Sequence, residues 1–311
     1  MTFLLRRGST PQQALSALDE ALTKLSNSVG FFPSSPAATY VTAVSDVEAH
    51  LGNAFDRQWV AETLFTPRYW HLLGVAHTTL PGPEFGRFST SDEQEQDEFE
   101  RRQRVEVTRI GPANNAADHE RRLQMERLEH TREDVQKLET FANGGGKILI
   151  IDTNTLMHAY PLEQIQWQKK NGMPAHEILR VLVPLAVIDE LDRKKFEGGD
   201  TMRRKAAAAI RSLYGHRKGL NPDVSATLTT TDGMTLTLEI PRDDLGRSRA
   251  AATDDEIRDF GVFVKEITGR PVTVVTRDMG LQLRCERAGL DVLWLHEDDW
   301  KQQEQSASKT K

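Results

Sequence analysis

Residues 147–158 read K-I-L-I-I-D-T-N-T-L-M-H, and this stretch decides the fold of the C-terminal half of the chain. The run 147–151 is short, apolar and mostly β-branched, which is typical of a strand buried on both faces of a parallel sheet. Three glycines at 144–146 mark the end of the preceding segment. Asp152 follows the run directly, where open α/β sheets place their ligand crevice. Taken alone, Asp152 could equally cap a helix that begins near Thr153.

Similar apolar runs recur beyond this stretch, with helical patterns between them. The strand-like runs lie at 148–151, 181–188, 272–275 and 292–295, and the helical stretches lie around 175–180, 191–214, 254–268 and 280–288. Pro184 lies inside the second run and permits a helix to start there. Strands that alternate with helices predict βαβ units and a mostly parallel sheet over 147–300. Residues 224–240 break this rhythm, because two alternating Thr/Leu runs joined by Asp232-Gly233 predict an inserted β-hairpin.

Residues 1–143 predict a mostly α-helical region that carries no recognisable chemical motif. Leucines at helical spacing favour a helix over 11–25, and a second amphipathic stretch covers 41–51. The aromatic residues of 59–70 favour a small packed core over a base-stacking surface. Residues 81–101 are polar and acidic, and we expect a loop or linker there.

The stretch 118–141 contains no Gly or Pro and predicts a long helix. Leu128, Val135 and Leu138 fall on one face of it, but they cover too few heptads to indicate a coiled coil. We expect this helix either to pack on the neighbouring domain or to mediate self-association, as a route to a homo-oligomer. Residues 301–311 read as a disordered tail.

Composition excludes several classes of protein. The formal net charge is −6, and no apolar run approaches the roughly 18–20 residues of a membrane span. The N-terminal apolar segment is too short for a secretory signal and its charges follow it, so we expect a cytoplasmic protein without membrane attachment. The single cysteine, Cys285, excludes an internal disulfide and a cysteine-based zinc site, and we expect it to be a buried thiol.

Acidic residues should gather at one edge of the sheet, some directly after strands and the others near the starts of helices. They are Asp152 after the first strand, Glu190 in V-I-D-E-L-D, Asp254 and Asp255 at a helix start, and Asp278 after V-T-V-V-T-R. Carboxylates gathered at one edge repel one another unless a cation lies among them. Oxygen ligands of this kind suit Mg²⁺ or Mn²⁺.

Each acid also has a simpler explanation. Asp254 and Asp255 could cap a helix and interact with its dipole. Glu190 could pair with Arg193 or Lys194 along its own helix, and Asp278 could start a turn. The four together, in fixed order and in matching strand contexts, are harder to produce by chance.

These motifs resemble those of the PIN-domain nucleases. The matching pieces are I-L-I-I-D-T-N-T-L (148–156), V-P-L-A-V-I-D-E-L-D (183–192), T-D-D-E-I (253–257), V-V-T-R-D-M-G-L (274–281) and A-G-L-D-V (288–292). Each motif is weak alone, and together they cover about half of the chain. The form V-I-D-E-L-D is most similar to the RNA-decay endonuclease branch of the family. The hairpin, the long N-terminal extension and the lack of a visible partner-binding tail depart from the compact family pattern.

The resemblance implies a doubly wound α/β domain that binds one or two divalent metal ions and cuts single-stranded RNA. It assigns the metal and the catalysis to Asp152, Glu190, Asp254 and Asp278, with Asp255 as a further candidate ligand. Asp254 fits the family spacing before Ile257 better than Asp255 does. Asn154 and Thr276 match polar positions that support the site in this family.

A basic segment follows Glu190. Residues 191–220 contain nine Lys and Arg against three acids, a net charge of +6 in an overall acidic chain. We expect phosphates of RNA to bind here, through Arg193, Lys194, Lys195, Arg203, Arg204 and Lys205. The alternative is a solvated basic helix face. Three further arginines, at 242, 247 and 249, precede Asp254.

The sequence therefore favours a metal-dependent endoribonuclease in which a metal-activated water hydrolyses RNA. A non-catalytic RNA-binding or scaffolding protein on the same fold is the first alternative. A toxin-type ribonuclease is the second, although the long N-terminal region is unlike such toxins. A DNA flap nuclease would need a helical arch or helix-hairpin-helix signal, and neither is seen.

Overall fold

The computed structural model describes residues 3–28, 36–78, 93–174, 177–220, 225–242 and 246–301. The chain divides into two compact units, Met1–Glu139 and Thr140–Lys311, each of which we describe by itself. No helix in the described residues is long and apolar enough to cross a membrane. The tail expected beyond Lys301 lies outside the described residues.

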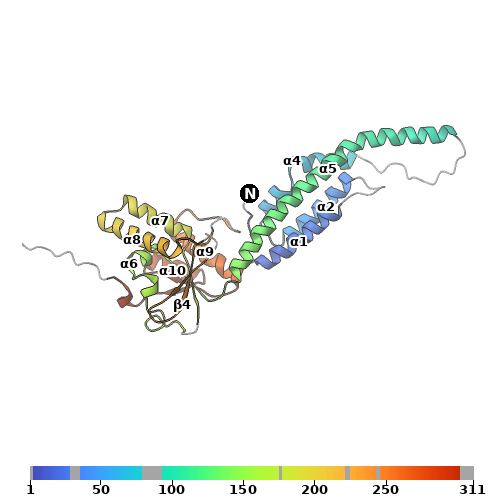
Figure 1. Cartoon of the computed structure of the whole chain (residues 1–311). Coiled ribbons are helices and arrows are strands. Elements are labelled where there is room, and N and C mark those ends of the chain that lie inside the picture. Colours follow the sequence, from blue (N-terminus) through green and yellow to red (C-terminus); the bar gives the residue numbers. More distant parts are fainter. Residues whose placement is uncertain are drawn as a thin grey trace, which may run out of the picture. The chain divides into compact units, whose positions relative to one another are not determined.

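The first unit is helical (Figure 1), as the sequence predicts. Its helices are α1 (Pro11–Asn27), α2 (Pro36–Leu51), α3 (Arg57–Leu64), α4 (Pro67–Thr78) and α5 (Glu93–Ala142), which runs on into the second unit. A capping box starts α1, because Thr10 Oγ1 accepts from the Gln13 backbone N–H at 3.2 Å while the Gln13 side chain accepts from the Thr10 N–H at 2.9 Å.

Helix α5 corrects two expectations from the sequence. It begins at Glu93, so the last part of the expected 81–101 linker is helical, and residues 81–92 lie outside the described residues. The stripe of Leu128, Val135 and Leu138 is buried inside the first unit. Self-association through this helix would therefore use its other faces.

The aromatic residues near α3 and α4 pack as a small core, as predicted. Trp59 and Tyr69 are buried, and the Trp59 ring lies 4.7 Å from that of Phe55. Trp70 is exposed, but its ring lies 5.7 Å from that of Phe65.

The second unit is built on a six-stranded sheet in the order β3-β4-β2-β1-β5-β6. The strands are β1 (Lys147–Ile151), β2 (Leu179–Leu182), β3 (Ala226–Thr229), β4 (Thr235–Glu239), β5 (Val272–Val275) and β6 (Asp291–Leu293). All neighbours pair in parallel except β3 with β4. The hairpin predicted at 224–240 is thus confirmed, and β4 also joins the main sheet beside β2.

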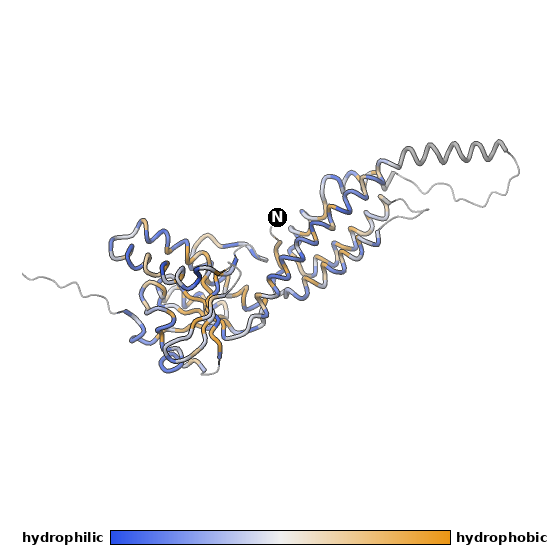
Figure 2. The backbone as a smooth tube through the Cα atoms, viewed as in Figure 1, coloured by the Kyte–Doolittle hydropathy of each residue, from blue (hydrophilic) through white to orange (hydrophobic). Residues whose placement is uncertain are grey.

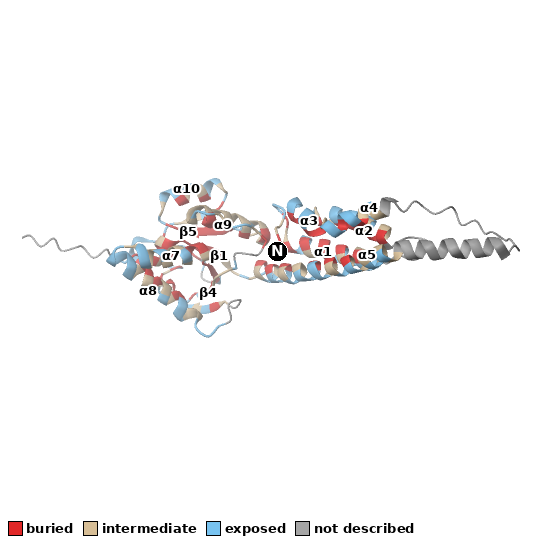
Figure 3. Ribbon diagram, turned by 90° about the horizontal axis from the view of Figure 1, so that it is seen from above, coloured by how far each residue is buried: buried red, intermediate tan, exposed pale blue. Residues whose placement is uncertain are grey.

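Helices cover both faces of this sheet, which confirms the doubly wound α/β class. They are α6 (Thr153–His158), α7 (Leu185–Glu197), α8 (Asp200–Arg217), α9 (Thr253–Thr268) and α10 (Met279–Arg287). Crossovers that run toward β4 carry α6, α7 and α8, and those that run toward β6 carry α9 and α10. Right-handed connections place these two groups on opposite faces, and Figure 3 shows α9 and α10 across the strands from α8.

Two helix predictions were wrong. The helix expected around 175–180 is absent from the described part of that stretch, where β2 begins at Leu179. The single helix expected over 191–214 is two helices, because Gly198 ends α7 and Gly199 precedes α8.

The strand order locates the ligand crevice of the sheet. From β1 the chain moves to β2 on one side, and β5 pairs with β1 on the other. The C-terminal ends of β1 and β5 therefore form the switch point at which such sheets bind ligands. Below this edge the buried strands form the core, and Figure 2 shows their apolar residues gathered at the centre of the unit.

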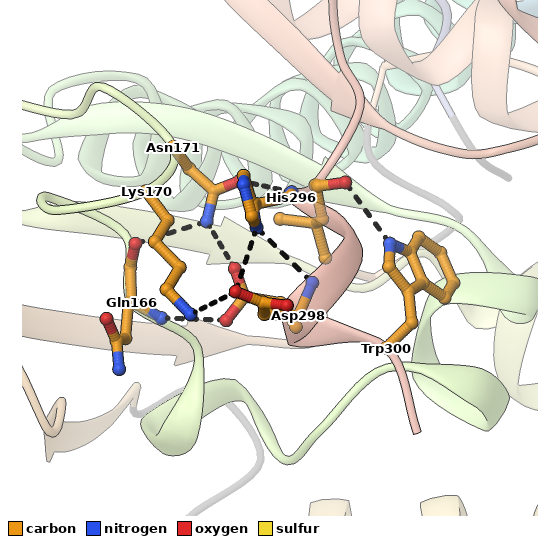
Figure 4. Close-up of polar contacts among 8 residues, drawn as sticks. Gln166, Lys170, Asn171, His296, Asp298 and Trp300 are labelled. Carbon is orange, nitrogen blue, oxygen red and sulfur yellow. Dashed lines mark hydrogen bonds and ion pairs between the residues drawn. The ribbon is translucent and has the colours of Figure 1, made fainter. Parts of the chain in front are cut away.

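Residues 295–301, here called the C-terminal clasp, pack against the loop that precedes β2 (Figure 4). The Asn171 amide donates to the buried carboxylate of Asp299 at 2.8 Å and accepts from the His296 backbone N–H at 2.9 Å. Lys170 and Asp298 form an ion pair at 2.8 Å. The clasp is thus fixed by several polar contacts to a different part of the chain.

Candidate functional site

Asp152 lies at the C-terminal end of β1 and is only 3% exposed. It is the N-cap of α6, where its Oδ1 accepts from the Thr155 backbone N–H at 2.6 Å. The helix-cap explanation is therefore correct, and Asp152 also lies at the switch point. Burial raises the pKa of Asp152 above its ordinary value, although hydrogen bonds from Thr155 and Thr276 oppose this rise.

Thr276 joins the first strand end to the second. Its hydroxyl donates to Asp152 Oδ2 at 2.6 Å and accepts from the Asp278 backbone N–H at 3.0 Å. Asp278 is the N-cap of α10, and its Oδ1 accepts from the Leu281 N–H at 3.0 Å. Both strand-end aspartates therefore have one carboxylate oxygen engaged by a helix N-terminus.

Glu190 comes from the second turn of α7 and reaches the start of α6. Its carboxylate accepts from the Thr153 hydroxyl at 2.7 Å and pairs with Lys194 at 2.9 Å. Arg193 lies farther away, at 4.0 Å. Burial acts to raise the pKa of Glu190, but the hydrogen bonds from Thr153 and Lys194 prevail and lower it. The helical pairing with Lys194 is thus present together with the contact to α6.

Asp254 lies in the first turn of α9. It does not cap that helix, whose N-cap is Ala252, so the cap explanation is wrong for this residue. Its carboxylate pairs with Arg284 of α10. Burial raises the pKa of Asp254; Arg284 opposes the rise, and repulsion from Asp278 and Glu190 adds to it.

These carboxylates therefore act on one another, although they come from four separate segments. Asp254 responds to the charges of Asp278 and Glu190, and Asp152 responds to the charge of Asp254. No group of three or more His, Cys, Asp or Glu side chains in the described residues lies close enough to hold a metal ion. The carboxylates can affect one another's pKa without touching, because charges interact over longer distances than the bonds between a metal and its ligands. Lys194 pairs with Glu190, and Arg284 pairs with Asp254.

The remaining candidate acid and amide are less central. Asp255 pairs with Arg258 on its own helix at 3.0 Å. Its charge nonetheless contributes to the raised pKa of Asp254. Asn154 lies half-buried in the first turn of α6.

The basic residues predicted to bind RNA divide into two groups. Lys194 and Lys205 turn toward the site: Lys194 pairs with Glu190, and the Lys205 ammonium lies 3.1 Å from Nδ1 of His158 in α6. The other four lie along α7 and α8: Arg193, Lys195, Arg203 and Arg204. The Lys195 ammonium lies 5.0 Å from the centre of the exposed Phe196 ring. Arg203 and Arg204 each donate to a backbone carbonyl near the start of α8.

Cys285 takes no part in this site. It is buried, as predicted, and burial raises the pKa of its thiol to about 11. A thiol of this kind is a poor nucleophile at neutral pH.

The family model of the PIN domain matches residues 149–296. This part of the chain is a PIN domain. The match spans β1 to the start of the clasp and contains all four acids that lie at the switch point. PIN domains are generally nucleases, that is, hydrolases, and typically use divalent metals. Among curated proteins no significant match to this chain was found.

The sequence left the role of Thr153 open and did not single out Arg284 or Glu256. Thr153 and Arg284 contact Glu190 and Asp254 from other helices. Glu256, fully buried at the start of α9, accepts from the Ala250 N–H at 2.7 Å and pairs with Arg247, which fixes the segment that leads to Asp254. The hydroxyl of Thr153 directly after Asp152 was a usable signal. The partners of Arg284 and Arg247 lie on segments whose packing the sequence does not reveal.

Proposed function

We propose that this chain is a divalent-metal-dependent endoribonuclease that hydrolyses phosphodiester bonds of single-stranded RNA. The observation that carries the proposal is the arrangement at the switch point of a PIN domain, where Thr276 bridges Asp152 and Asp278 and where Glu190 reaches the start of α6 through Thr153. Carboxylates that repel one another in a partly buried site favour a bound cation.

The donor set fits Mg²⁺ or Mn²⁺, because all its side-chain donors are hard oxygens. Asp152 and Asp278 would hold the ion, with Glu190 or Asp254 as ligands if a second ion binds. When bound, such an ion supplies a water of lowered pKa and a positive charge opposite the phosphate.

The protein residues orient this centre. Thr276 fixes Asp152 relative to Asp278 through its two hydrogen bonds, and Thr153 fixes Glu190. Lys194 and Arg284 balance the carboxylate charge, and both are available to contact phosphate once a cation replaces them. Hydrolysis with departure of the 3′ oxygen would leave a 5′-phosphate and a 3′-hydroxyl.

The basic side chains of α7 and α8 supply the attraction for RNA. Lys195 beside the exposed Phe196 ring pairs a cation with a stacking surface, a combination that suits single-stranded nucleic acid. Binding by this surface should weaken steeply with added salt.

The test incubates labelled single-stranded RNA and single-stranded DNA with the full chain in Mg²⁺, Mn²⁺ or EDTA. Wild type should cut RNA internally with either ion and not in EDTA. Asp152→Asn and Asp278→Asn should abolish cutting. Asp259→Asn, on the same helix as Asp254, is the matched control and should cut normally. Undiminished cutting by Asp152→Asn would refute the proposal, and RNA binding without cutting by wild type would favour a scaffolding role.

A further inference from the structure

Lys205 and Lys301 contact His158 at the C-terminal end of α6. The Lys205 ammonium donates to His158 Nδ1 at 3.1 Å, since an ammonium has no acceptor. The pKa of His158 is lowered, first by burial and then by the charges of Lys205, Lys194 and Lys301. All three lysines therefore act on one ring, and we call Lys194, Lys205 and Lys301 the lysine cluster.

Lys301 reaches this place because the C-terminal clasp holds it there. The Lys301 backbone N–H donates to the His158 carbonyl at 2.9 Å. The backbones of Trp300 and Ala159 also pair in an isolated antiparallel β-bridge. The Trp300 ring is covered by Arg277 at 5.0 Å. The contacts of Figure 4 thus fix the backbone that presents Lys301 beside α6.

The charge of the cluster is incompletely balanced by protein. Lys194 pairs with Glu190 at 2.9 Å, whereas in the described parts of the chain neither Lys205 nor Lys301 forms an ion pair. The pKa of Lys301 is lowered, by burial of part of the side chain and by repulsion from Lys205. Neighbouring ammonium groups that repel one another are stabilised by a shared anion.

The cluster also adjoins the carboxylates, because Lys194 contacts Glu190 and acts on His158. We propose that Lys205 and Lys301, which contact His158, and Lys194, which pairs with Glu190, form a phosphate-binding subsite. This subsite takes a phosphate of the RNA chain other than the one that is cut. This inference rests on the proposed function. An internal phosphodiester and a terminal 5′-phosphate share the required chemistry, and compact ammonium charges suit both.

The test measures binding of the full chain to a 3′-fluorescent single-stranded oligoribonucleotide in EDTA, where no cutting occurs. The oligonucleotide carries either a 5′-hydroxyl or a 5′-phosphate, and anisotropy is followed over a range of salt. Lys205→Gln and Lys301→Gln are compared with wild type. Arg287→Gln is the control, because it removes one exposed charge at the C-terminal end of α10, on the sheet edge opposite the site.

Each lysine variant should weaken binding several-fold and reduce the slope of log affinity against log salt by about 0.7, the value for one phosphate contact on a single strand. Arg287→Gln should bind like wild type. Equal losses with both oligonucleotides would identify an internal phosphate, and a loss confined to the 5′-phosphorylated one would identify a terminal phosphate. Unchanged affinity of both lysine variants, with unchanged melting temperatures, would overturn the subsite, as would failure of wild type to bind RNA.

Cutting in Mn²⁺ separates this result from the proposed function. Wild-type cutting that both lysine variants retain, with unchanged affinity, would overturn the subsite alone. Lysine-dependent binding with no cutting by wild type would support the subsite and overturn the nuclease.

Discussion

At the scale of single residues, the hydroxyl of Thr276 links two strand ends. It donates to one oxygen of Asp152 and accepts from the backbone of Asp278. Thr276 is fully buried, so water cannot replace these hydrogen bonds at low cost. The relative position of the two aspartates therefore depends on this side chain.

Replacing Thr276 with Val should lower the rate of RNA cutting about 10–100-fold, the usual cost of losing a group that orients a metal ligand. The shape of the side chain is kept, but Asp152 loses a donor. Thr276→Ser keeps the hydroxyl and should retain most activity. Single-turnover cutting in Mn²⁺ measures both, and equal rates for the Val and Ser variants would contradict this role.

Without a bound metal, the buried charge of Asp152 should lower the stability of the folded protein. The pKa of Asp152 is raised in the folded state, so folding disfavours its charged form. The resulting loss of stability is complete at pH values above the folded pKa. It disappears as the pH falls through that pKa toward the unfolded value of about 3.9. Asp152→Asn should therefore melt at a higher temperature than wild type at pH 7 in EDTA. Each kcal/mol relieved raises Tm by roughly 2–4 °C for a unit of this size.

The difference in melting temperature should shrink as the pH approaches 4, because wild-type Asp152 then becomes neutral as well. Added Mn²⁺ should stabilise wild type more than Asp152→Asn. A variant that melts below wild type at pH 7 in EDTA would show that the hydrogen bonds outweigh the buried charge.

Residue types and spacing predicted that Asp152 and Asp278 lie at the C-terminal ends of neighbouring strands, because each follows a recognisable apolar run. Spacing also predicted the pair of Glu190 with Lys194 within α7, but it could not predict contacts between helices. Arg284 pairs with Asp254 across two helices, and Thr153 contacts Glu190 between α6 and α7. Such contacts depend on how helices pack, which no local pattern encodes.

At the scale of elements, a buried ion pair ties the hairpin to the sheet. Arg180 of β2 donates twice to Glu239 of β4, from Nε at 2.8 Å and Nη2 at 2.7 Å. The Arg180 side chain is 3% exposed and also lies over the Phe141 ring at 4.4 Å. The same strands pair in parallel, so this bidentate contact supports the register of β4.

Glu239→Leu should lower the free energy of unfolding by about 3 kcal/mol, since it leaves the Arg180 charge buried without its partner. We expect the lower end of the usual range because the Phe141 ring and the Gly144 carbonyl still contact Arg180. Adding Arg180→Met should recover most of the loss. Urea unfolding of both single variants and the double variant completes the cycle, and a double variant as unstable as Glu239→Leu would contradict this explanation.

Arg180 also explains one wrong prediction. A charged residue beside Leu179 weakens the apolar pattern of β2, so the stretch 175–180 looked helical when it runs into a strand. The Asp232-Gly233 turn, in contrast, correctly predicted the hairpin. The parallel pairing of β4 with β2 was not predictable, because that pairing joins residues 57 positions apart in the chain.

At the scale of the whole molecule, the PIN domain carries its own core. Among the described residues, the apolar cluster of the sheet draws only on those from Phe141 to Trp300. A chain of residues 140–301 should therefore fold cooperatively and cut RNA with the same metal dependence as the full chain. Thermal unfolding and cutting assays measure this, and an unfolded 140–301 fragment would show that the first unit is needed for folding.

The C-terminal clasp has a consequence for the order in which the protein matures during synthesis. All four acids have been synthesised once the ribosome has passed Asp278, but the edge strand β6 and the clasp come later. Until Lys301 has emerged, a nascent chain holds its acids without the segment that completes the sheet and the lysine cluster. Because Lys301 is the last member of the proposed phosphate-binding subsite to be made, that subsite is completed after the basic side chains of α7 and α8 and after all four acids.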